Sequence, residues 1–241
     1  MPRFMIISTG VYNQEYMDRA AASVDAQTHK DWQYIQVIDD AASWPERGVF
    51  FHPAGPRTTK IIREHCGALK NFVDVMTDAV LKPGDIVVRL DLDDQITPNA
   101  LEIVAKAYQD NPKAVLTYGS MQYESRKPAR FQGSYKEEPI RFAGWKSTHL
   151  LTFRAELWKH IRKDAFLARD GQYYQSAADL AIFYPLAELA GLDRIVHIEE
   201  PIYIYNDLND MNDHKVDPEL QKKCEKQIRR KPPHKRIKDV G

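Results

Sequence analysis

The chain has 241 residues, of which 43% are hydrophobic and 28% charged, and its formal net charge is zero. This is the composition of a globular domain, and no apolar run approaches the roughly 18 residues of a membrane span. The only cysteines, Cys66 and Cys224, lie far apart, which excludes a disulfide framework and a cysteine-based zinc site. The first residues turn polar too soon for a secretion signal, so we expect a cytoplasmic protein.

The zero net charge hides an uneven distribution. Residues 222–238 hold nine Lys or Arg and one acid, Glu225, which leaves the rest of the chain acidic. An acidic body argues against nucleic acid as a partner. The basic segment has two interpretations, which are a solvated chain end and a peripheral contact with anionic lipid at the inner face of a membrane.

Short apolar runs alternate with helical periodicity over the first 120 residues. In chain order the pattern predicts strands at 4–8, 32–38, 49–52, 86–90 and 114–118, and helices at 15–26, 60–81 and 97–109. Thr97 is the expected cap of the last helix, with Pro98 at its first position. This alternation predicts an α/β fold with a mainly parallel sheet flanked by helices.

The second half of the sequence is less regular. We expect a polar segment at 124–142 that forms either a long surface loop or a pair of short strands, and an extended segment at 144–154. A helix at 178–190, strands at 194–198 and 201–205, and a charged helix from 217 follow. The sequence contains no convincing linker. We therefore predict one domain, residues 1–215, followed by a basic C-terminal helix and tail, residues 216–241.

Two predicted strands end in acidic side chains. Asp39 and Asp40 close one strand, and Asp91, Asp93 and Asp94 follow another. Parallel sheets bind ligands beyond the carboxyl ends of their strands, and crowded carboxylates with oxygen ligands alone suit Mg²⁺ or Mn²⁺. Asp39 and Asp40 have no glycine-rich loop beside them, so they suit a base or ribose better than a phosphate. A turn-forming role is the alternative for both groups.

Several well-known motifs are missing. The sequence contains no GxGxxG, GxxxxGK[ST], HExxH or GxSxG pattern. Their absence disfavours a Rossmann dehydrogenase, a P-loop enzyme, a zinc protease and an α/β-hydrolase.

The order of seven segments resembles the family 2 inverting glycosyltransferases of GT-A fold, especially those of envelope polysaccharide and lipopolysaccharide synthesis. The match covers about residues 3–215, and its segments are Ser23–Thr28, Val37–Ser43, Gly67–Asn71, Asp91–Asp94, His149–Arg154, Tyr203–Asn206 and Asn212–Lys215. Ala178 departs from the family, which carries Glu before the residue equivalent to Asp179. The QxxRW motif of processive synthases is absent as well, which favours the addition of a single sugar over polymerisation.

The resemblance implies a UDP- or GDP-sugar donor and a divalent cation, Mn²⁺ or Mg²⁺. It places the donor nucleotide beside Thr9, Gly10, Tyr12, Asp39, Asp40 and Asp91, with Lys70 at the diphosphate. The expected metal ligands are Asp93, Asp91, Asp94 and His214. For Lys70 a solvated charge, and for His214 a surface position, are the alternatives.

The resemblance also implies a general base, for which Asp179 is our choice, although an Asp at a helix start also serves as a cap. Trp145 and His149 are candidates for the acceptor side, with core packing as the alternative. The acceptor would be a glycan or a lipid-linked sugar. The competing functions are a catalytically silent sugar-nucleotide-binding module and a phosphatase of the haloacid-dehalogenase type.

Overall fold

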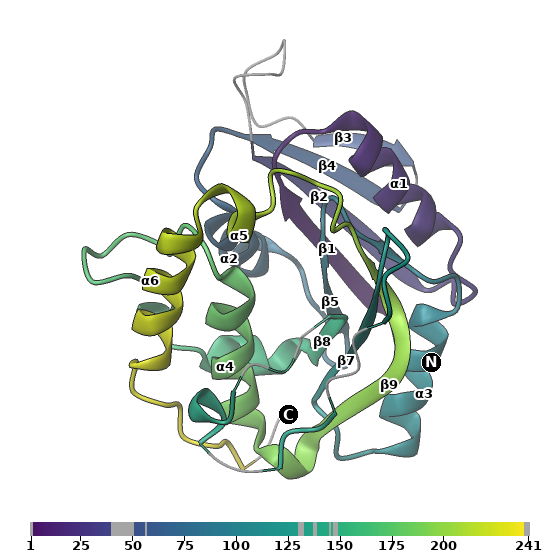
Figure 1. Cartoon of the computed structure of the whole chain (residues 1–241). Coiled ribbons are helices and arrows are strands. Elements are labelled where there is room, and N and C mark those ends of the chain that lie inside the picture. The colour runs from purple at the N-terminus through teal and green to yellow at the C-terminus, as the bar shows by residue number, and fades with distance from the viewer. Residues whose placement is uncertain are drawn as a thin grey trace.

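A sheet of nine strands runs through the described part of the chain, with helices on both of its faces (Figure 1). The structure is a computed structural model and describes residues 2–39, 51–55, 57–129, 133–136, 139–144, 146 and 149–238. Asp40 and Trp145, two of the expected site residues, lie outside these ranges. The strands, in chain order, are β1 (Phe4–Gly10), β2 (Trp32–Asp39), β3 (Phe51–Gly55), β4 (Thr58–Arg63), β5 (Ile86–Asp91), β6 (Gln95–Ile96), β7 (Leu116–Tyr123), β8 (Leu151–Arg154) and β9 (Ile195–Tyr205).

The α-helices are α1 (Gln14–Asp25), α2 (Ala68–Asp78), α3 (Ala100–Asp110), α4 (Ala178–Ala190), α5 (Asp213–Val216) and α6 (Pro218–Arg229). None of the helices in the described ranges is long and apolar enough to cross a membrane. The predicted helices at 15–26 and 178–190 are confirmed within one residue at each end, and Pro185 lies inside α4.

The pairing of the strands brings several carboxyl ends to one edge. The sheet order is β3-β4-β2-β1-β5-β8-β7-β9-β6. β1 pairs in parallel with β2 and β5, and β2 pairs in parallel with β4. β8 runs antiparallel between β5 and β7. Because β1, β2 and β5 run in the same direction, their last residues, Gly10, Asp39 and Asp91, lie at the same edge of the sheet.

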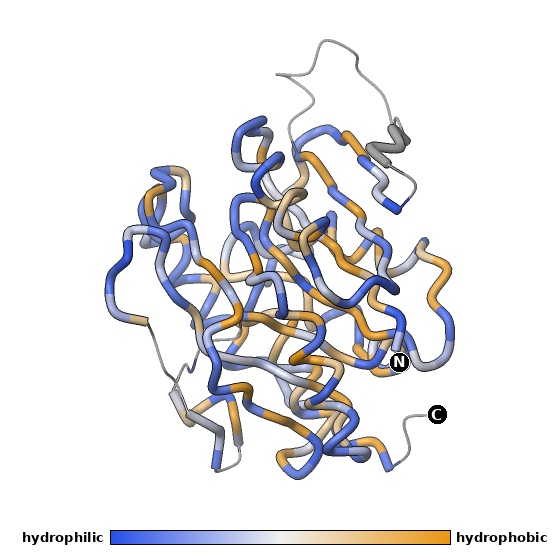
Figure 2. Tube along the Cα trace, turned by 90° about the vertical axis from the view of Figure 1, so that its right-hand side faces the viewer, coloured by the Kyte–Doolittle hydropathy of each residue, from blue (hydrophilic) through white to orange (hydrophobic). Residues whose placement is uncertain are grey.

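Alternate residues of each buried strand supply two hydrophobic layers. In β1, Met5 and Ile7 pack toward α2 and α4, whereas Phe4 and Ile6 pack toward α3. Figure 1 shows α2, α4 and α6 on one side of the sheet and α1 and α3 on the other. In Figure 2 hydrophobic stretches recur along the segments in the middle of the molecule. The sheet is therefore buried on both faces, as the continuous apolar strands predict.

The helix predicted over residues 60–81 is wrong in its first third. The segment expected as a helix over 60–81 begins with strand β4, and its helix α2 spans only Ala68–Asp78. The residues of β4, Thr58-Thr59-Lys60-Ile61-Ile62-Arg63, are mostly β-branched and pair in register with β2. Gly67 then adopts a φ of 90° before the helix starts. The apolar residues from Ile62 onward are spaced as in a helix, but Ile62 belongs to strand β4 and the residues after Gly67 belong to helix α2.

Two further boundaries differ from expectation. Helix α3 starts at Ala100 with Asn99 as its N-cap residue, because the Thr97 N–H bonds to the Ile202 carbonyl at 3.0 Å and stays with the sheet. The two strands expected at 194–198 and 201–205 form one strand, β9. Its pairing with β7 shifts register between Gly119 and Met121, which accommodates Pro201, a residue that cannot donate to the ladder.

Candidate active site

A cavity of about 520 Å³ opens beyond the carboxyl ends of β1, β2 and β5. Its walls also include the start of α4 and the segment from the end of β9 through α5. Ten of the residues that we expected at a functional site line it: Thr9, Gly10, Tyr12, Asp39, Asp91, Asp93, Asp94, His149, Asp179 and His214. Residues more than 200 positions apart in the chain thus meet at the edge where the sequence predicted a ligand.

Arg89 is a cation within this acidic wall, and sequence reasoning missed it. Arg89 and Asp91 lie two residues apart in β5, so their side chains leave the same face of the sheet. The Arg89 Nη2 atom lies 2.7 Å from Asp91 Oδ1, and the Arg89 side chain is 7% exposed. The charges of Asp91 and Asp179 raise the pKa of Arg89 against the effect of burial. A charged residue in the middle of the apolar run Ile86–Leu90 was the available signal.

Asp93 faces a buried and negatively charged environment. Asn209, in the loop after β9, donates its side-chain N–H to Asp93 Oδ2 at 2.7 Å. Burial raises the pKa of Asp93, the charge of Asp91 raises it further, and the hydrogen bond from Asn209 acts in the opposite direction. The two carboxylates therefore repel one another in the absence of a further positive charge.

Asp94 has a different set of partners from its neighbours. The Tyr203 hydroxyl donates to its Oδ2 atom, and the Asn206 backbone N–H donates to Oδ1 at 2.7 Å. Its carboxyl group is buried, and burial raises its pKa well above the usual range, with the charges of Asp93 and Asp91 adding to the shift. Asp94 therefore fixes the end of β9, from which Asn209 and His214 reach the cavity.

Asp39 organises the start of helix α2. Its two carboxylate oxygens accept hydrogen bonds from the backbone N–H groups of Cys66 and Gly67, at 2.8 and 2.9 Å. The Nδ1 atom of His65 lies 3.2 Å from the same carboxylate. The carboxylate thus satisfies N–H groups at the helix N-terminus, which have no partner within the helix.

Asp179 lies in the first turn of α4 and is half-buried. Ala177, the N-cap residue of α4, has a φ of 59°, and the Asp179 Oδ1 atom accepts a hydrogen bond from the Leu180 N–H at 2.9 Å. Burial raises the pKa of Asp179 to about 6, while Arg89 opposes this shift and Asp91 adds to it. A carboxyl group with this pKa is ionised at neutral pH and can accept a proton.

The remaining expected residues lie at the rim of the cavity or outside it. Lys70 is outside, because its ammonium group pairs with Asp74, four residues further along α2, at 2.6 Å. His149 lines the cavity and stacks on Tyr203, with the ring centroids 4.6 Å apart. His214 is exposed on the four-residue helix α5.

The carboxylates of the site fit a divalent cation that also binds phosphate oxygens. No group of three or more His, Cys, Asp or Glu side chains in the described ranges forms a ready metal cage. Mg²⁺ and related ions at phosphate-binding sites use one or two carboxylates together with phosphate oxygens. Asp91 and Asp93 match this need, since both line the cavity and the charge of one raises the pKa of the other.

The architecture has counterparts among solved structures. S. aureus TarS 1-349 superposes with a TM-score of 0.61 and 16% identity, over 85% of this chain. Its complex with UDP-GlcNAc gives a TM-score of 0.64 and 16% identity, and its complex with UDP a TM-score of 0.60 and 15% identity. The chain spans about 60% of the length of that fragment. At this identity the likeness concerns the fold, and no curated protein matches the chain.

The fold and the family model together define the class as a glycosyltransferase of GT-A fold. The family model described as glycosyl transferase family 2 matches residues 7–165. The chain belongs to this family. The expected fold class and enzyme class are therefore confirmed.

Proposed function

We propose that this glycosyltransferase moves one sugar from a UDP-sugar to an acceptor hydroxyl with inversion, and that Asp179 is the general base. The observation that carries the proposal is the position of Asp179 in the wall of the cavity, with a pKa of about 6. A base with a pKa just below the working pH is largely ionised and still accepts a proton efficiently.

The donor occupies the part of the cavity beside β1 and β2. Thr9, Gly10, Tyr12 and Asp39 line this part, and they are the residues expected to hold the nucleoside. The TarS complexes with UDP and UDP-GlcNAc support UDP rather than GDP as the nucleotide. Lys70 is a weaker candidate for the diphosphate, because Asp74 already pairs with its ammonium group.

Asp93 and Asp91 would hold a Mn²⁺ or Mg²⁺ ion, and Asp94 would fix their loop through Tyr203 and Asn206. A bound ion supplies positive charge that stabilises a departing diphosphate. Of the residues expected at the metal, His214 lies on α5 at the rim, where it remains a candidate further ligand.

In the transfer step the acceptor oxygen forms a bond to the anomeric carbon. The bond from that carbon to the diphosphate oxygen breaks, and its electron pair leaves with UDP. Asp179 receives the hydroxyl proton on the face opposite the leaving group, which inverts the anomeric configuration. Arg89 holds Asp91 at 2.7 Å beside this centre. His149 lies on the acceptor side, where a glycan or lipid-linked sugar would bind.

The test combines a donor screen with three variants. Purified protein with Mn²⁺ should slowly release UDP from one preferred UDP-sugar, with water as the acceptor. Asp179→Asn should bind UDP as tightly as the wild type but lose at least about 100-fold in release rate. Asp93→Asn should lose both release and Mn²⁺-dependent UDP binding. Asp110→Asn changes an exposed carboxylate on α3 and should leave both unchanged.

Two outcomes would contradict the proposal. A normal rate in Asp179→Asn would show that another group accepts the proton. UDP-sugar binding without any release or transfer, in the wild type and across the whole donor panel, would indicate a catalytically silent sugar-nucleotide-binding module.

A further inference from the structure

Helix α6 presents a basic face to the outside of the molecule. Cys224 and Ile228 are buried on its inner side and pack in the same hydrophobic layer as α4. Lys222, Lys226 and Arg230 follow at steps of four residues on the opposite side, and all three are exposed. Figure 1 shows α6 at the outer edge of the molecule, with α4 between it and the sheet.

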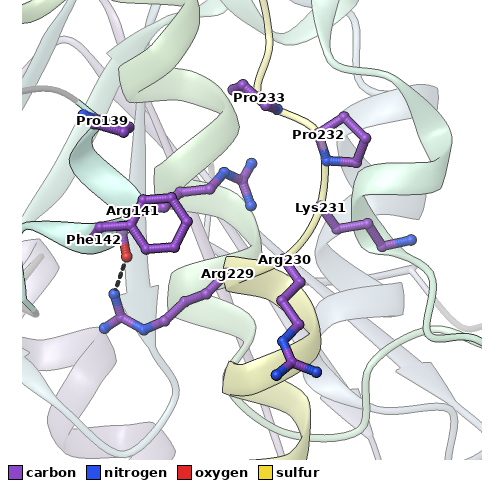
Figure 3. A pocket seen from close by; sticks show the side chains of 8 residues that line it. All are labelled: Pro139, Arg141, Phe142, Arg229, Arg230, Lys231, Pro232 and Pro233. Atoms are coloured by element: carbon purple, nitrogen blue, oxygen red, sulfur yellow. Dashed lines mark hydrogen bonds between the residues drawn. The ribbon is translucent and has the colours of Figure 1, made fainter.

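A second hollow continues this basic face beyond the end of α6. Its volume is about 390 Å³, and Figure 3 shows the side chains around it. The lining residues are Pro139, Arg141, Phe142, Arg229, Arg230, Lys231, Pro232 and Pro233. This hollow is separate from the acidic cavity, since the two share no lining residue.

The cations around this hollow differ in how far they are engaged. Arg141 is buried and pairs with Glu188, and Arg229 donates to Glu225 and to the Arg141 carbonyl. In contrast, no acid in the described part of the chain pairs with Arg230 or Lys231. The hollow is thus lined by two arginines that are engaged within the protein, and by the exposed Arg230 and the half-exposed Lys231, which are available to an external anion.

Apolar side chains are exposed at both ends of the basic face. Phe142 is 72% exposed beside the hollow, and Val216 is 58% exposed just before α6 begins. Helix α6 has twelve residues and is therefore roughly 18 Å long. Two acids lie on this helix near the cations, Glu219 and Glu225, and each already pairs with a basic residue of α6. Glu219 pairs with Lys222 of this face, so Lys226 and Arg230 are the face cations of α6 that no acid in the described ranges pairs with.

We propose that this face, formed by the outer side of α6, Arg230, Lys231 and Phe142, docks onto an anionic lipid bilayer. Basic residues near an anionic bilayer gain electrostatic attraction, and an aromatic side chain suits the boundary between headgroups and acyl chains. Leu220 and Gln221, in the first turns of α6, line the acidic cavity. Helix α6 therefore forms part of the wall of the acidic cavity through its inner side, on which Leu220 lies with Cys224, while its basic face is turned outward.

The test measures sedimentation of the full chain with vesicles of phosphatidylcholine, with and without phosphatidylglycerol. The wild type should bind only the anionic vesicles, and added salt should weaken binding. The triple variant Lys222→Gln/Lys226→Gln/Arg230→Gln should bind about a hundredfold more weakly. Phe142→Ser, which changes no charge, should weaken binding several-fold. The control Lys30→Gln/Lys106→Gln/Lys113→Gln removes the same charge from the side of the sheet that carries α3 and should bind as the wild type does.

The outcome does not depend on the proposed sugar transfer, because the vesicle assay needs no donor and no catalysis. Equal binding of the two triple variants would overturn the proposal, and so would binding to soluble polyphosphate without binding to anionic vesicles. Circular dichroism and thermal unfolding of each variant establish that it is folded before its binding is compared.

Discussion

The carboxyl group of Asp179 owes its raised pKa chiefly to burial, and this gives the transfer reaction a pH dependence. Its pKa is about 6, with Arg89 limiting the shift and Asp91 enlarging it. As the general base that we propose, Asp179 acts in its ionised form, so the rate at low donor concentration should rise with pH, reach half its maximum near pH 6 and then level off. A pH profile of UDP release, measured with saturating Mn²⁺, checks this. A rate that is flat from pH 5 to pH 8 would contradict the assignment.

The same burial has a consequence for stability. In the unfolded chain the carboxyl group of Asp179 titrates near 3.9, so between about pH 4 and 6 the folded protein binds a proton that the unfolded chain releases. Stability therefore falls as pH rises through this window and stays lower above it. Asp179→Asn removes the titration, and we expect the free energy of unfolding at pH 7 to increase by about 1–3 kcal/mol.

Urea unfolding without donor or divalent ion, at pH 7 and near pH 4, measures this change. The gain should shrink at the lower pH, where the wild-type carboxyl group is already protonated in the folded state and about half protonated in the unfolded chain. A loss of stability at pH 7 in Asp179→Asn would contradict the origin that we assign to the raised pKa.

At the residue scale, the positions of the site carboxylates could be predicted from the sequence, whereas the residues that pair with them mostly could not. Asp39, Asp91 and Asp93 could be expected at one edge because a parallel sheet brings strand ends together. The two-residue spacing of Arg89 and Asp91 in one strand indicated a shared face, but the burial of the pair beside Asp179 depends on the tertiary packing and could not be read from the sequence. Lys70 was expected at the diphosphate, but an acid four residues along the same helix face was already visible in the sequence as a competing partner.

At the scale of elements, the close approach of β1 to the turn after β5 depends on Gly10. A Cβ atom there would lie 2.8 Å from the Leu92 Cβ, in the wall of the acidic cavity. Gly10→Ala should therefore lower the free energy of unfolding by about 1–3 kcal/mol and weaken UDP binding. Gly119→Ala is the comparison variant: its Cβ would lie 3.0 Å from the Ile198 carbonyl, and Gly119 itself does not line that cavity. Chemical unfolding and UDP titration of both variants measure these effects. An equal loss of UDP affinity in the two variants would contradict the role that we assign to Gly10.

Helix α6 belongs to the packed body of the protein through its inner side. Ile228 is 1% exposed against the layer that contains α4. Ile228→Ala should lower the free energy of unfolding by about 2–4 kcal/mol. Lys226→Ala, on the outer side of the same helix, should change it by less than about 0.5 kcal/mol. Urea unfolding of the two variants tests this difference, and a small effect in both would mean that α6 contributes little to the core.

The elements themselves show why local periodicity is an incomplete guide. β4 and α2 were predicted as one helix because buried residues on both sides of Gly67 happen to follow a helical spacing. Pairing of β4 with β2 decided the outcome, and that pairing joins segments more than 20 residues apart. The joining of two predicted strands into β9 has the same origin, since β9 pairs with β7 at both of its ends and with β6 near its C-terminal end.

At the scale of the whole molecule, the strand order places acids from several segments around one cavity, and this predicts coupled binding of ion and nucleotide. Asp91, Asp93, Asp94 and Asp179 all line that cavity, so a diphosphate alone meets negative charge and should bind weakly. A divalent ion between the carboxylates and the diphosphate removes this repulsion. UDP and Mn²⁺ together should therefore raise the unfolding temperature by more than the sum of their separate effects.

Thermal unfolding with Mn²⁺, UDP, both, and both with excess chelator measures this coupling. The chelator should reduce the joint effect to that of UDP alone. Asp93→Asn should lose most of the coupling, whereas Asp110→Asn should keep it, because the carboxylate of Asp110 pairs with Lys106 on the surface of α3. Purely additive shifts in the wild type would mean that ion and nucleotide bind at independent places, and the ion would then have no part in holding the diphosphate.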